Sequence, residues 1–214
     1  MTDNNKPPKK STSHYFSESP DTASRRTEFS IEGPRGELRL ASDAGVFSQY
    51  GLDKGTSVLL EAMAKHAPRE LPAGSAVCDL GCGSGAIALT LASLYPHCTI
   101  YAIDVNERAR ELCADNAKRN GLTNVIVQAP TDVDVSLRFQ LLWSNPPIRI
   151  GKDALHELLL AWLARLDIEG VAHLVVSKNL GADSLADWLS DNKFPTSKLG
   201  SSKGFRVLRV VAER

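Results

Sequence analysis

The sequence lacks an excess of either charge: Lys and Arg total 25, Asp and Glu total 25, and the formal net charge of the 214 residues is zero. A neutral chain exerts no overall attraction on nucleic acid, so any RNA binding must come from a local basic patch. No apolar run is long enough to span a bilayer, and residues 1–16 lack the apolar stretch of a signal peptide. We therefore expect a cytoplasmic protein that has no membrane segment.

The sequence also has few cysteines, and their spacing is uninformative. Cys78, Cys82, Cys98 and Cys113 form no Cys-x-x-Cys pair, and no His-rich tract lies beside them. A zinc site or a disulfide framework is therefore not expected. Buried free thiols in a reducing compartment are the simpler interpretation.

The first part of the chain differs in composition from the rest. Residues 1–24 are rich in Lys, Pro, Ser, Asn and Asp and offer little to bury, which indicates a disordered basic tail. Two short runs on either side of Gly33-Pro34-Arg35-Gly36 predict a β-hairpin within residues 25–50. We expect residues 51–214 to form the main domain, and the apolar content of the whole chain, 43%, suffices for one sizeable core.

The region from Ala76 onward alternates short apolar runs with amphipathic segments. A helix at residues 52–66 precedes this region and starts at Asp53 or Thr56. Repeated strand–helix units predict an α/β fold in which helices cover both faces of a parallel sheet. The expected strands are residues 76–80, 99–104, 124–128, 139–144, 171–177 and 205–213, and the expected helices are residues 86–95, 107–120 and 154–166 and one that includes residues 185–190.

A glycine-rich turn follows the first of these strands. Gly81, Gly83 and Gly85 allow a sharp turn and the close approach of a ligand, and their spacing differs from the Gly-x-Gly-x-x-Gly fingerprint of dinucleotide-binding proteins. Asp79 precedes the first glycine, and a carboxylate there suits an ammonium group but would repel a pyrophosphate. The helix that follows points its positive end at the ligand, which suits a carboxylate. The turn therefore favours a ligand with an amino acid moiety.

Asp104 ends the next expected strand, about twenty residues after the glycines, where an acid accepts hydrogen bonds from ribose hydroxyls. An acid at the N-terminal end of a helix is the alternative interpretation. A ligand with both an amino acid end and a ribose is S-adenosylmethionine, and we place Cys82 and Val105 in its binding site as well. Asn116 is a candidate for holding backbone near this cofactor, although Asn120 with the glycine after it more simply ends the helix.

The expected strand at residues 139–144 runs into Asn145-Pro146-Pro147, where two successive prolines rigidify the turn. An ordinary strand-ending turn is the alternative. An exocyclic amine conjugated to a ring is a poor nucleophile because its lone pair is delocalised. The Asn145 side-chain oxygen and the Pro146 carbonyl would accept its two N–H bonds, direct the lone pair at the methyl group and stabilise the positive charge on nitrogen. We therefore assign Asn145, Pro146 and Pro147 to catalysis of N-methyl transfer.

The glycine-rich turn, Asp104 and the Asn-Pro-Pro turn together resemble class I S-adenosylmethionine-dependent methyltransferases. More narrowly, the chain resembles the RsmC-like group of small-subunit ribosomal RNA guanine-N2 methyltransferases over about residues 27 to 212. The segments that carry this narrower resemblance are residues 45–48, 52–56, 145–152 and 203–208.

The resemblance implies a Rossmann-like sheet of seven mostly parallel strands, the last antiparallel, with a lid for cofactor and substrate within residues 25–50. It implies methylation of a guanine in small-subunit ribosomal RNA, a base that must be unpaired or extruded to reach the pocket. It also implies further site residues. Those expected to close over the cofactor are Phe47, Asp53, Gly55 and Thr56, and those expected to bind phosphate are Arg149, Lys152, Lys203 and Arg206, for which solvated surface charge is the alternative.

The sequence departs from the family pattern in three ways. Some relatives have two tandem methyltransferase domains, whereas this chain has room for one. Many have an acid after the third strand that meets the adenine amino group; here Ala129 takes that place, and Asp132 or backbone would have to substitute. Ile148 replaces the aromatic residue of many Asn-Pro-Pro enzymes, so base stacking must come from elsewhere, and Phe47 is a candidate.

Two other functions stay open. A protein glutamine N5-methyltransferase acting on a release factor would use the same chemistry, although that family usually has Tyr where this chain has Ile148. A non-catalytic cofactor-binding or RNA-binding assembly factor is supported only by Ala129. Carbon methylation would typically need a cysteine nucleophile, and Cys82 in the glycine turn is wrongly placed for that. A monomer is compatible with the sequence, and we expect no metal.

Overall fold

The fold is seen in a computed structural model, which describes residues 23–47 and 51–213. The predicted basic tail at residues 1–24 lies almost wholly outside the described residues. No helix in the described part of the chain is long and apolar enough to cross a membrane. All four cysteines are buried free thiols, as predicted.

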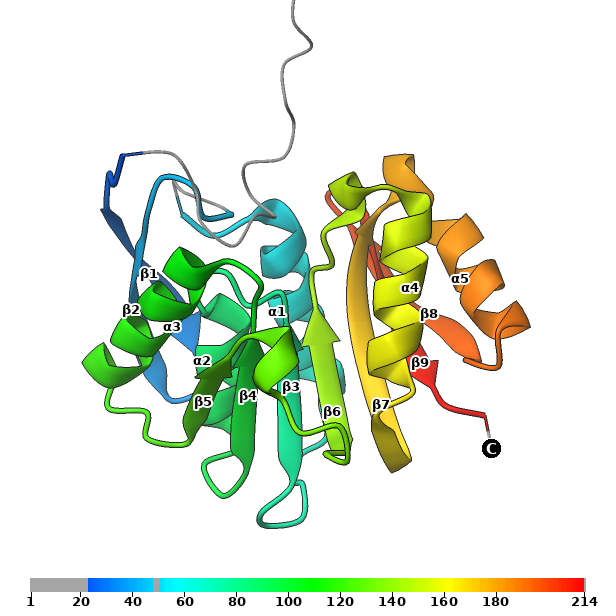
Figure 1. Ribbon diagram of the computed structural model, residues 1–214, viewed down its shortest axis with the longest axis horizontal. Coiled ribbons are helices and arrows are strands. Elements are labelled where there is room, and N and C mark those ends of the chain that lie inside the picture. Colours follow the sequence, from blue (N-terminus) through cyan, green and yellow to red (C-terminus); the bar gives the residue numbers. More distant parts are fainter. Residues whose placement is uncertain (1–22, 48–50, 214) are drawn as a thin grey trace, which may run out of the picture.

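A seven-stranded sheet forms the centre of the molecule (Figure 1). Neighbouring strands are parallel, except that β9 runs antiparallel to both of its neighbours. This arrangement confirms the predicted Rossmann-like architecture with an antiparallel last strand. In spatial order, the strands are β5 (Val125–Gln128), β4 (Thr99–Ile103), β3 (Ala76–Leu80), β6 (Phe139–Ser144), β7 (Leu166–Ser177), β9 (Phe205–Val211) and β8 (Thr196–Ser202).

Helices cover both faces of the sheet (Figure 1) and bury one apolar core on each side. Strand β6 lies between the two cores, because alternate side chains of a strand point to opposite faces: Leu141 belongs to one core and Leu142 to the other, and neither is exposed. Each fully buried Leu contributes about 1.5–3 kcal/mol. One face carries α1 (Lys54–His66), α2 (Ala86–Leu94) and α3 (Glu107–Arg119), and the other carries α4 (Lys152–Leu163) and α5 (Ala182–Asp191).

The structure departs from the predicted elements mainly at two boundaries and one missed strand, and the other predicted ends agree to within about two residues. Helix α4 ends at Leu163 and not at residue 166, and strand β7 begins at Leu166 and not at residue 171. The pairing of β6 with β7 jumps between Leu166 and Val171, because Glu169 has a positive φ of 64° and a bulge interrupts the register. The first residues of β7 include Asp167 and Glu169, so they do not show the apolar pattern that predicts a strand. Strand β8 was not predicted at all, since its sequence TSKLGSS is mostly polar and lies at the sheet edge.

The predicted hairpin is present as β1 (Thr27–Gly33) and β2 (Gly36–Ser42), which form a separate two-stranded sheet. Asparagine side chains of α3 hold it. The Asn116 Oδ1 accepts from the Ala41 backbone nitrogen at 2.8 Å, and its Nδ2 donates to the Ala41 carbonyl and to the Ser84 carbonyl, each at 2.8 Å. Asn120 ends α3 and also bonds both backbone groups of Arg39. One buried side chain therefore joins the hairpin to the glycine-rich turn, which confirms the interpretation of Asn116 as a backbone anchor.

Candidate active site

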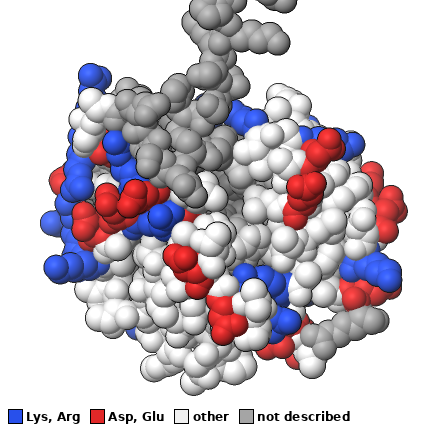
Figure 2. All heavy atoms as spheres, in the orientation of Figure 1, with Lys and Arg blue, Asp and Glu red and all other residues white. Residues whose placement is uncertain are grey.

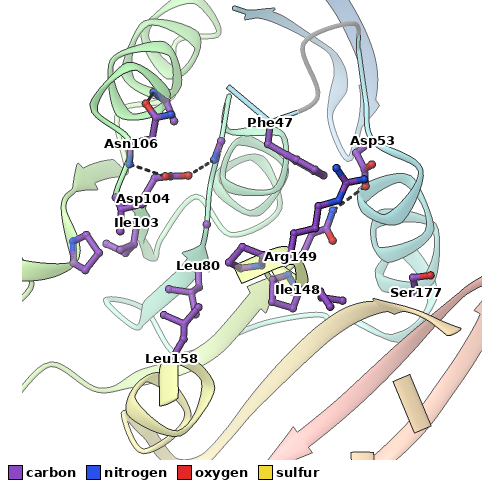
Figure 3. A pocket seen from close by; sticks show the side chains of 18 of the residues that line it. Phe47, Asp53, Leu80, Ile103, Asp104, Asn106, Ile148, Arg149, Leu158 and Ser177 are labelled. Carbon is purple, nitrogen blue, oxygen red and sulfur yellow. Dashed lines mark hydrogen bonds between the residues drawn. The ribbon is translucent and has the colours of Figure 1, made fainter. Parts of the chain in front are cut away.

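A cavity of about 500 Å³ opens at the carboxyl ends of β3, β4, β6 and β7 (Figure 3). Ligands of open α/β sheets bind in this position. Figure 3 shows Asp104 and Asn106 on one side of the cavity and Asp53 and Arg149 on the other. The lining residues are Phe47, Asp53, Leu80, Gly81, Gly83, Ile103, Asp104, Val105, Asn106, Ala109, Pro130, Asn145, Pro146, Pro147, Ile148, Arg149, Leu158, Ser177, Leu180 and Phe205.

The glycine-rich turn forms one wall, and backbone hydrogen bonds fix its shape. The amides of Gly81 and Cys82 both donate to the Ile103 carbonyl, at 2.8 and 3.0 Å. All three glycines have positive φ, namely 78° at Gly81, 54° at Gly83 and 93° at Gly85, a region that favours glycine. A Cβ at Gly85 would also lie 2.7 Å from the Cys113 Sγ. The turn therefore requires its glycines for backbone shape and for packing.

Asp104 is hydrogen-bonded to the glycine-rich turn and lines the cavity. Its Oδ2 accepts from the Gly83 amide and its Oδ1 from the Asn106 amide, each at 2.9 Å. Burial raises the pKa of this carboxyl above its usual value, and the two backbone hydrogen bonds oppose that rise. Asp104 lines the cavity beside Val105, which is 41% exposed. A carboxylate held from behind in this way can accept hydrogen bonds from ligand hydroxyls with its remaining lone pairs.

Asp79 lies beneath the glycine-rich turn and lines neither the main cavity nor the smaller pocket beside it. It is fully buried; its Oδ2 accepts from the Ala88 amide of α2 at 2.9 Å, and its Oδ1 has no partner among the described residues. Burial raises its pKa to about 8. The expected contact of Asp79 with a ligand ammonium group stays a prediction.

Asn106 lines the cavity although the sequence did not single it out. Its Oδ1 accepts from the Ala109 amide, which caps α3, and its Nδ2 donates to the Gly45 carbonyl at 2.9 Å. Gly45 leads directly to Phe47, which also lines the cavity and is 46% exposed. An Asn just before a predicted helix signals a cap, but its link to the N-terminal segment is a long-range contact that local patterns do not reveal.

The Asn-Pro-Pro turn forms the opposite wall. Asn145 follows β6, and its Nδ2 donates to the Asp53 Oδ2 at 2.8 Å and to the Thr56 Oγ1 at 3.1 Å. The Pro146 carbonyl accepts from the Ile148 amide at 2.8 Å, so one of its lone pairs is used within the turn. Its second lone pair and the Asn145 Oδ1 are the acceptors that this wall can offer a ligand amine.

Asp53 begins helix α1 next to this wall. Its Oδ2 accepts from the amides of Gly55 and Thr56, at 2.7 and 3.2 Å, which confirms the predicted helix start. Gly55 lines neither pocket; a Cβ there would lie 3.0 Å from the Phe205 ring, so glycine permits the close approach of that ring. Thr56 and Cys82 lie in the small adjoining pocket of about 30 Å³, which also touches Asp53 and Asn145.

Apolar side chains complete the cavity on the side of the Asn-Pro-Pro turn. Ile148, Leu158, Leu180 and Phe205 come from η2 (Ile148–Ile150), α4, η3 (Lys178–Leu180) and β9. Sequence patterns alone did not select Leu158, Leu180 or Phe205 as site residues, because these side chains meet only in the folded chain. Phe205 adds an aromatic ring to the wall, beside the predicted candidate Phe47.

The four residues that were expected to bind phosphate do not lie together in the structure. Arg149 lines the cavity, and Lys152 is exposed at the start of α4. Lys203 forms an ion pair with Glu61 at 2.7 Å, and Arg206 pairs with Asp183 and is only 17% exposed. The structure therefore brings Arg149 alone of the four into the cavity wall.

The visible face of the molecule carries interspersed basic and acidic side chains (Figure 2). Basic groups gather over the β1–β2 hairpin and α3, at the left of this view, but acidic neighbours accompany them. The ion pairs there are Arg26–Asp115, Arg39–Glu37 and Arg119–Glu28.

Two further points concern ligands. The expected substitute for the adenine-contacting acid, Asp132 in η1 (Pro130–Asp132), does not line the cavity, whereas Pro130 does. In the described part of the chain, no group of three or more His, Cys, Asp or Glu side chains is placed to hold a metal ion.

Comparisons with known proteins find methyltransferases. The family model described as methyltransferase small domain matches residues 37–209. The protein YbxB of Bacillus subtilis (strain 168) is 34% identical over 200 residues, which are 92% of this chain and 97% of that protein. The ribosomal RNA small subunit methyltransferase C of Shewanella piezotolerans is 30% identical over 158 residues, which are 72% of this chain and 44% of that protein.

Solved structures with this fold include the T. thermophilus 16S rRNA N2 G1207 methyltransferase (RsmC) in complex with AdoMet and guanosine. It has a TM-score of 0.74 and 25% identity, covering 91% of this chain and 52% of that chain. The ribosomal protein L11 methylase of Lactobacillus delbrueckii has a TM-score of 0.62 at 20% identity, covering 77% of this chain and 81% of that chain, and it shows the fold alone. The present chain spans about half the length of the RsmC relatives that it matches.

Proposed function

This chain belongs to the methyltransferase small domain family, and we propose that it methylates guanine N2 of small-subunit ribosomal RNA. It is an S-adenosylmethionine-dependent methyltransferase. The observation that carries the proposal is that Asp104 and Asn145 line the same cavity. Asn145 is hydrogen-bonded to Asp53, which lies across the cavity from Asp104 (Figure 3). One wall suits a ribose, and the other suits an amine.

The cofactor fits the half of the cavity beside the glycine-rich turn. A volume of about 500 Å³ lies within the usual range for ligand pockets. Asp104 would accept the ribose hydroxyls, and Gly81 and Gly83 leave room for close approach because they have no side chain. Phe47 and Val105 provide apolar surface there. S-adenosylmethionine supplies an electrophilic methyl group when it is bound.

The acceptor amine is assigned to the Asn-Pro-Pro wall. The Asn145 Oδ1 and the free lone pair of the Pro146 carbonyl would accept its two N–H bonds and stabilise the positive charge that grows on nitrogen. No strong base is required, since the methylated cationic nitrogen is acidic and loses its proton to water. The apolar group of Ile148, Leu180 and Phe205 would enclose the base and exclude water from the reacting atoms.

RNA is the proposed partner because relatives bear the name ribosomal RNA small subunit methyltransferase C. A base must leave its stack to enter a cavity of this kind. Arg149 and Lys152 are the proposed phosphate contacts, whereas Lys203 and Arg206 would have to exchange Glu61 and Asp183 for phosphate. Such a substrate places the protein in the cytoplasm.

A labelled-methyl transfer assay tests the proposal. Assembled small subunits, naked small-subunit rRNA and a release factor are incubated separately with the protein and methyl-labelled S-adenosylmethionine. Labelled RNA is digested to nucleosides and separated by chromatography. We expect the label in N2-methylguanosine from one of the two RNA substrates, and the loss of this label in the variant Asn145→Ala.

Label in glutamine of the release factor would replace the RNA proposal with the protein substrate. Label in a different nucleoside would keep the RNA substrate and contradict the guanine assignment. No transfer to any of the three, despite normal cofactor binding, would contradict the proposed substrates.

A further inference from the structure

The Asn145 amide is held by two side chains from the start of helix α1. Its Nδ2 donates one hydrogen bond to the Asp53 Oδ2 at 2.8 Å and one to the Thr56 Oγ1 at 3.1 Å. The first contact joins residues 92 positions apart and the second joins residues 89 positions apart. Both protons of the amide nitrogen are therefore used inside the protein, and only the amide oxygen is left for a ligand.

The chemistry of Asp53 decides which way the amide faces. An ionised carboxylate accepts hydrogen bonds and cannot donate them. The Asp53 Oδ2 already accepts from the Gly55 and Thr56 amides. A flipped Asn145 would place its oxygen against this carboxylate oxygen with no proton between them. The flipped amide would also turn its own N–H groups toward the incoming amine, which is itself a donor.

We propose that Asp53 and Thr56 are positioning residues that lock the Asn145 amide with its Oδ1 toward the acceptor amine. The inference rests on the proposed transfer to an amine, and it assigns a role in that reaction to two residues that do not carry the chemistry themselves. Donation from the amide nitrogen to a carboxylate also polarises the amide and makes its oxygen a stronger acceptor. The gain appears as positive charge develops on the acceptor nitrogen.

Capping of the helix does not account for these contacts. A cap needs only the bonds from Asp53 to the Gly55 and Thr56 amides. The contact between the Thr56 hydroxyl and the Asn145 amide adds nothing to the cap. Thr56 is only 7% exposed, and this contact gives its buried hydroxyl a hydrogen-bond partner. The Phe205 ring, packed against Gly55, keeps the first turn of α1 next to the Asn-Pro-Pro wall.

Two variants separate the anchor from the cap. Thr56→Val keeps the shape of the side chain and leaves the Asp53 cap untouched, but it removes one acceptor. Asp53→Ser keeps a side chain that caps helices well, but it removes the carboxylate that binds Asn145. Asp53→Asn retains an oxygen acceptor and serves as the conservative rescue. Asp187→Asn, on the exposed side of α5, is the control for loss of one negative charge.

Steady-state methyl transfer to the RNA substrate is measured for each variant, with cofactor affinity measured separately. We expect kcat to fall about 30-fold or more in Asp53→Ser and about 3- to 10-fold in Thr56→Val, with the RNA KM and the cofactor Kd within about threefold of wild type. Asp53→Asn should recover to within about tenfold of wild type because the acceptor geometry is kept. The control Asp187→Asn should match wild type. Full activity in both Asp53→Ser and Thr56→Val would overturn the proposal.

Side-chain amide exchange provides a readout that does not depend on activity. The 15N–1H signals of the Asn145 amide are identified as those missing from Asn145→Ala. Each variant removes one anchoring bond, and the bond to the charged Asp53 is the stronger. We therefore expect hydrogen exchange with water to quicken by about tenfold or more in Asp53→Ser and to a smaller extent in Thr56→Val. Unchanged exchange in both variants would contradict the lock. If wild-type protein transferred no methyl group to RNA while exchange changed as expected, the proposed substrate would fail and the amide lock would stand.

Discussion

The two walls of the cavity are built in different ways. The glycine-rich wall is held mainly by neighbouring loops: the Gly83 amide and the Asp104 carboxylate lie 21 positions apart and follow adjacent parallel strands. The Asn-Pro-Pro wall depends on contacts that span the chain, because Asn145 is held by residues 92 and 89 positions earlier. One wall is therefore a local backbone device, and the other is a tertiary assembly of side chains.

The two walls match the two halves of a methyl transfer. The glycine-rich wall offers backbone turns and one carboxylate, which suit the constant part of the reaction, namely the cofactor. The Asn-Pro-Pro wall draws on α1, α4, η3 and β9, and these elements decide what can lie against Asn145. We expect substitutions on the first wall to act on cofactor binding and stability, and those on the second to act on turnover.

The largest expected effect is on the Asn-Pro-Pro wall. Asn145→Ala removes the amide oxygen that would accept from the amine, so kcat should fall about 100- to 1,000-fold. The cofactor Kd should stay within about threefold of wild type, since this side chain acts on the transition state. Single-turnover transfer and calorimetric titration with S-adenosylmethionine measure the two quantities. An equal loss of cofactor affinity would erase the distinction between the walls.

Asp104→Ala should act mainly on binding. It removes the proposed ribose acceptor and leaves the amides of Gly83 and Asn106 without their partner. Cofactor binding should weaken by roughly 1–3 kcal/mol, the scale for a hydrogen bond to a charged group. Calorimetric titration measures it, with Asp132→Asn as the control, because Asp132 does not line the cavity. A greater loss of affinity in the control than in Asp104→Ala would contradict the proposed position of the cofactor beside Asp104.

Asp79→Asn should remove a pH dependence from the stability of the glycine-rich wall. Burial raises the pKa of Asp79 to about 8, above the usual value of 3.8, so the folded state holds one more proton than the unfolded state between those values. The stability from this group is fully present below pH 3.8 and is lost as the pH rises toward 8.

Relative to Asp79→Asn, the free energy of unfolding of the wild-type protein should fall by about 1.4 kcal/mol for each pH unit in that window. Urea denaturation of both proteins without cofactor, at pH 5.5 and pH 6.5, measures the slope. Parallel pH profiles would show that Asp79 has the same pKa in the folded and unfolded states, and would contradict a pKa raised by burial.

The smallest expected effect concerns a pair of glycines with similar backbone. Gly85 and Gly74 have φ values of 93° and 79°, so alanine is strained at both positions. A Cβ at Gly85 would press on the Cys113 Sγ, whereas a Cβ at Gly74 would meet open space. Gly85→Ala should therefore destabilise the protein by about 1 kcal/mol more than Gly74→Ala. Thermal unfolding of the two variants measures the difference, and equal losses would mean that only backbone shape matters in the turn.

The glycine-rich wall could be predicted from sequence because its signals are local. A strand, three glycines and an acid at the end of the next strand lie within one strand–helix–strand unit, and the sheet brings Gly83 and Asp104 together. Asp79 was placed in the correct strand, but its burial beneath the turn depends on the packing of α2 over it.

The Asn-Pro-Pro wall could be predicted only in part. The turn itself is visible as a sequence motif, and Asp53 is visible as a helix start. Their contact is not, because no local pattern links residues that are 92 positions apart. Phe205 and Leu180 enter the cavity through β9 and η3, whose positions depend on the whole sheet. Strand β8 was missed for a different reason: an edge strand needs few apolar residues, so its sequence lacks the pattern of a strand.

The most direct test of the two-wall account is a solved complex of the protein with S-adenosylmethionine. The account predicts the ribose hydroxyls within hydrogen-bond distance of the Asp104 carboxylate and the methyl group directed at the Asn145 Oδ1, with the Asn145 Nδ2 still bound to Asp53. A cofactor bound outside this cavity, or a methyl group directed away from Asn145, would contradict it.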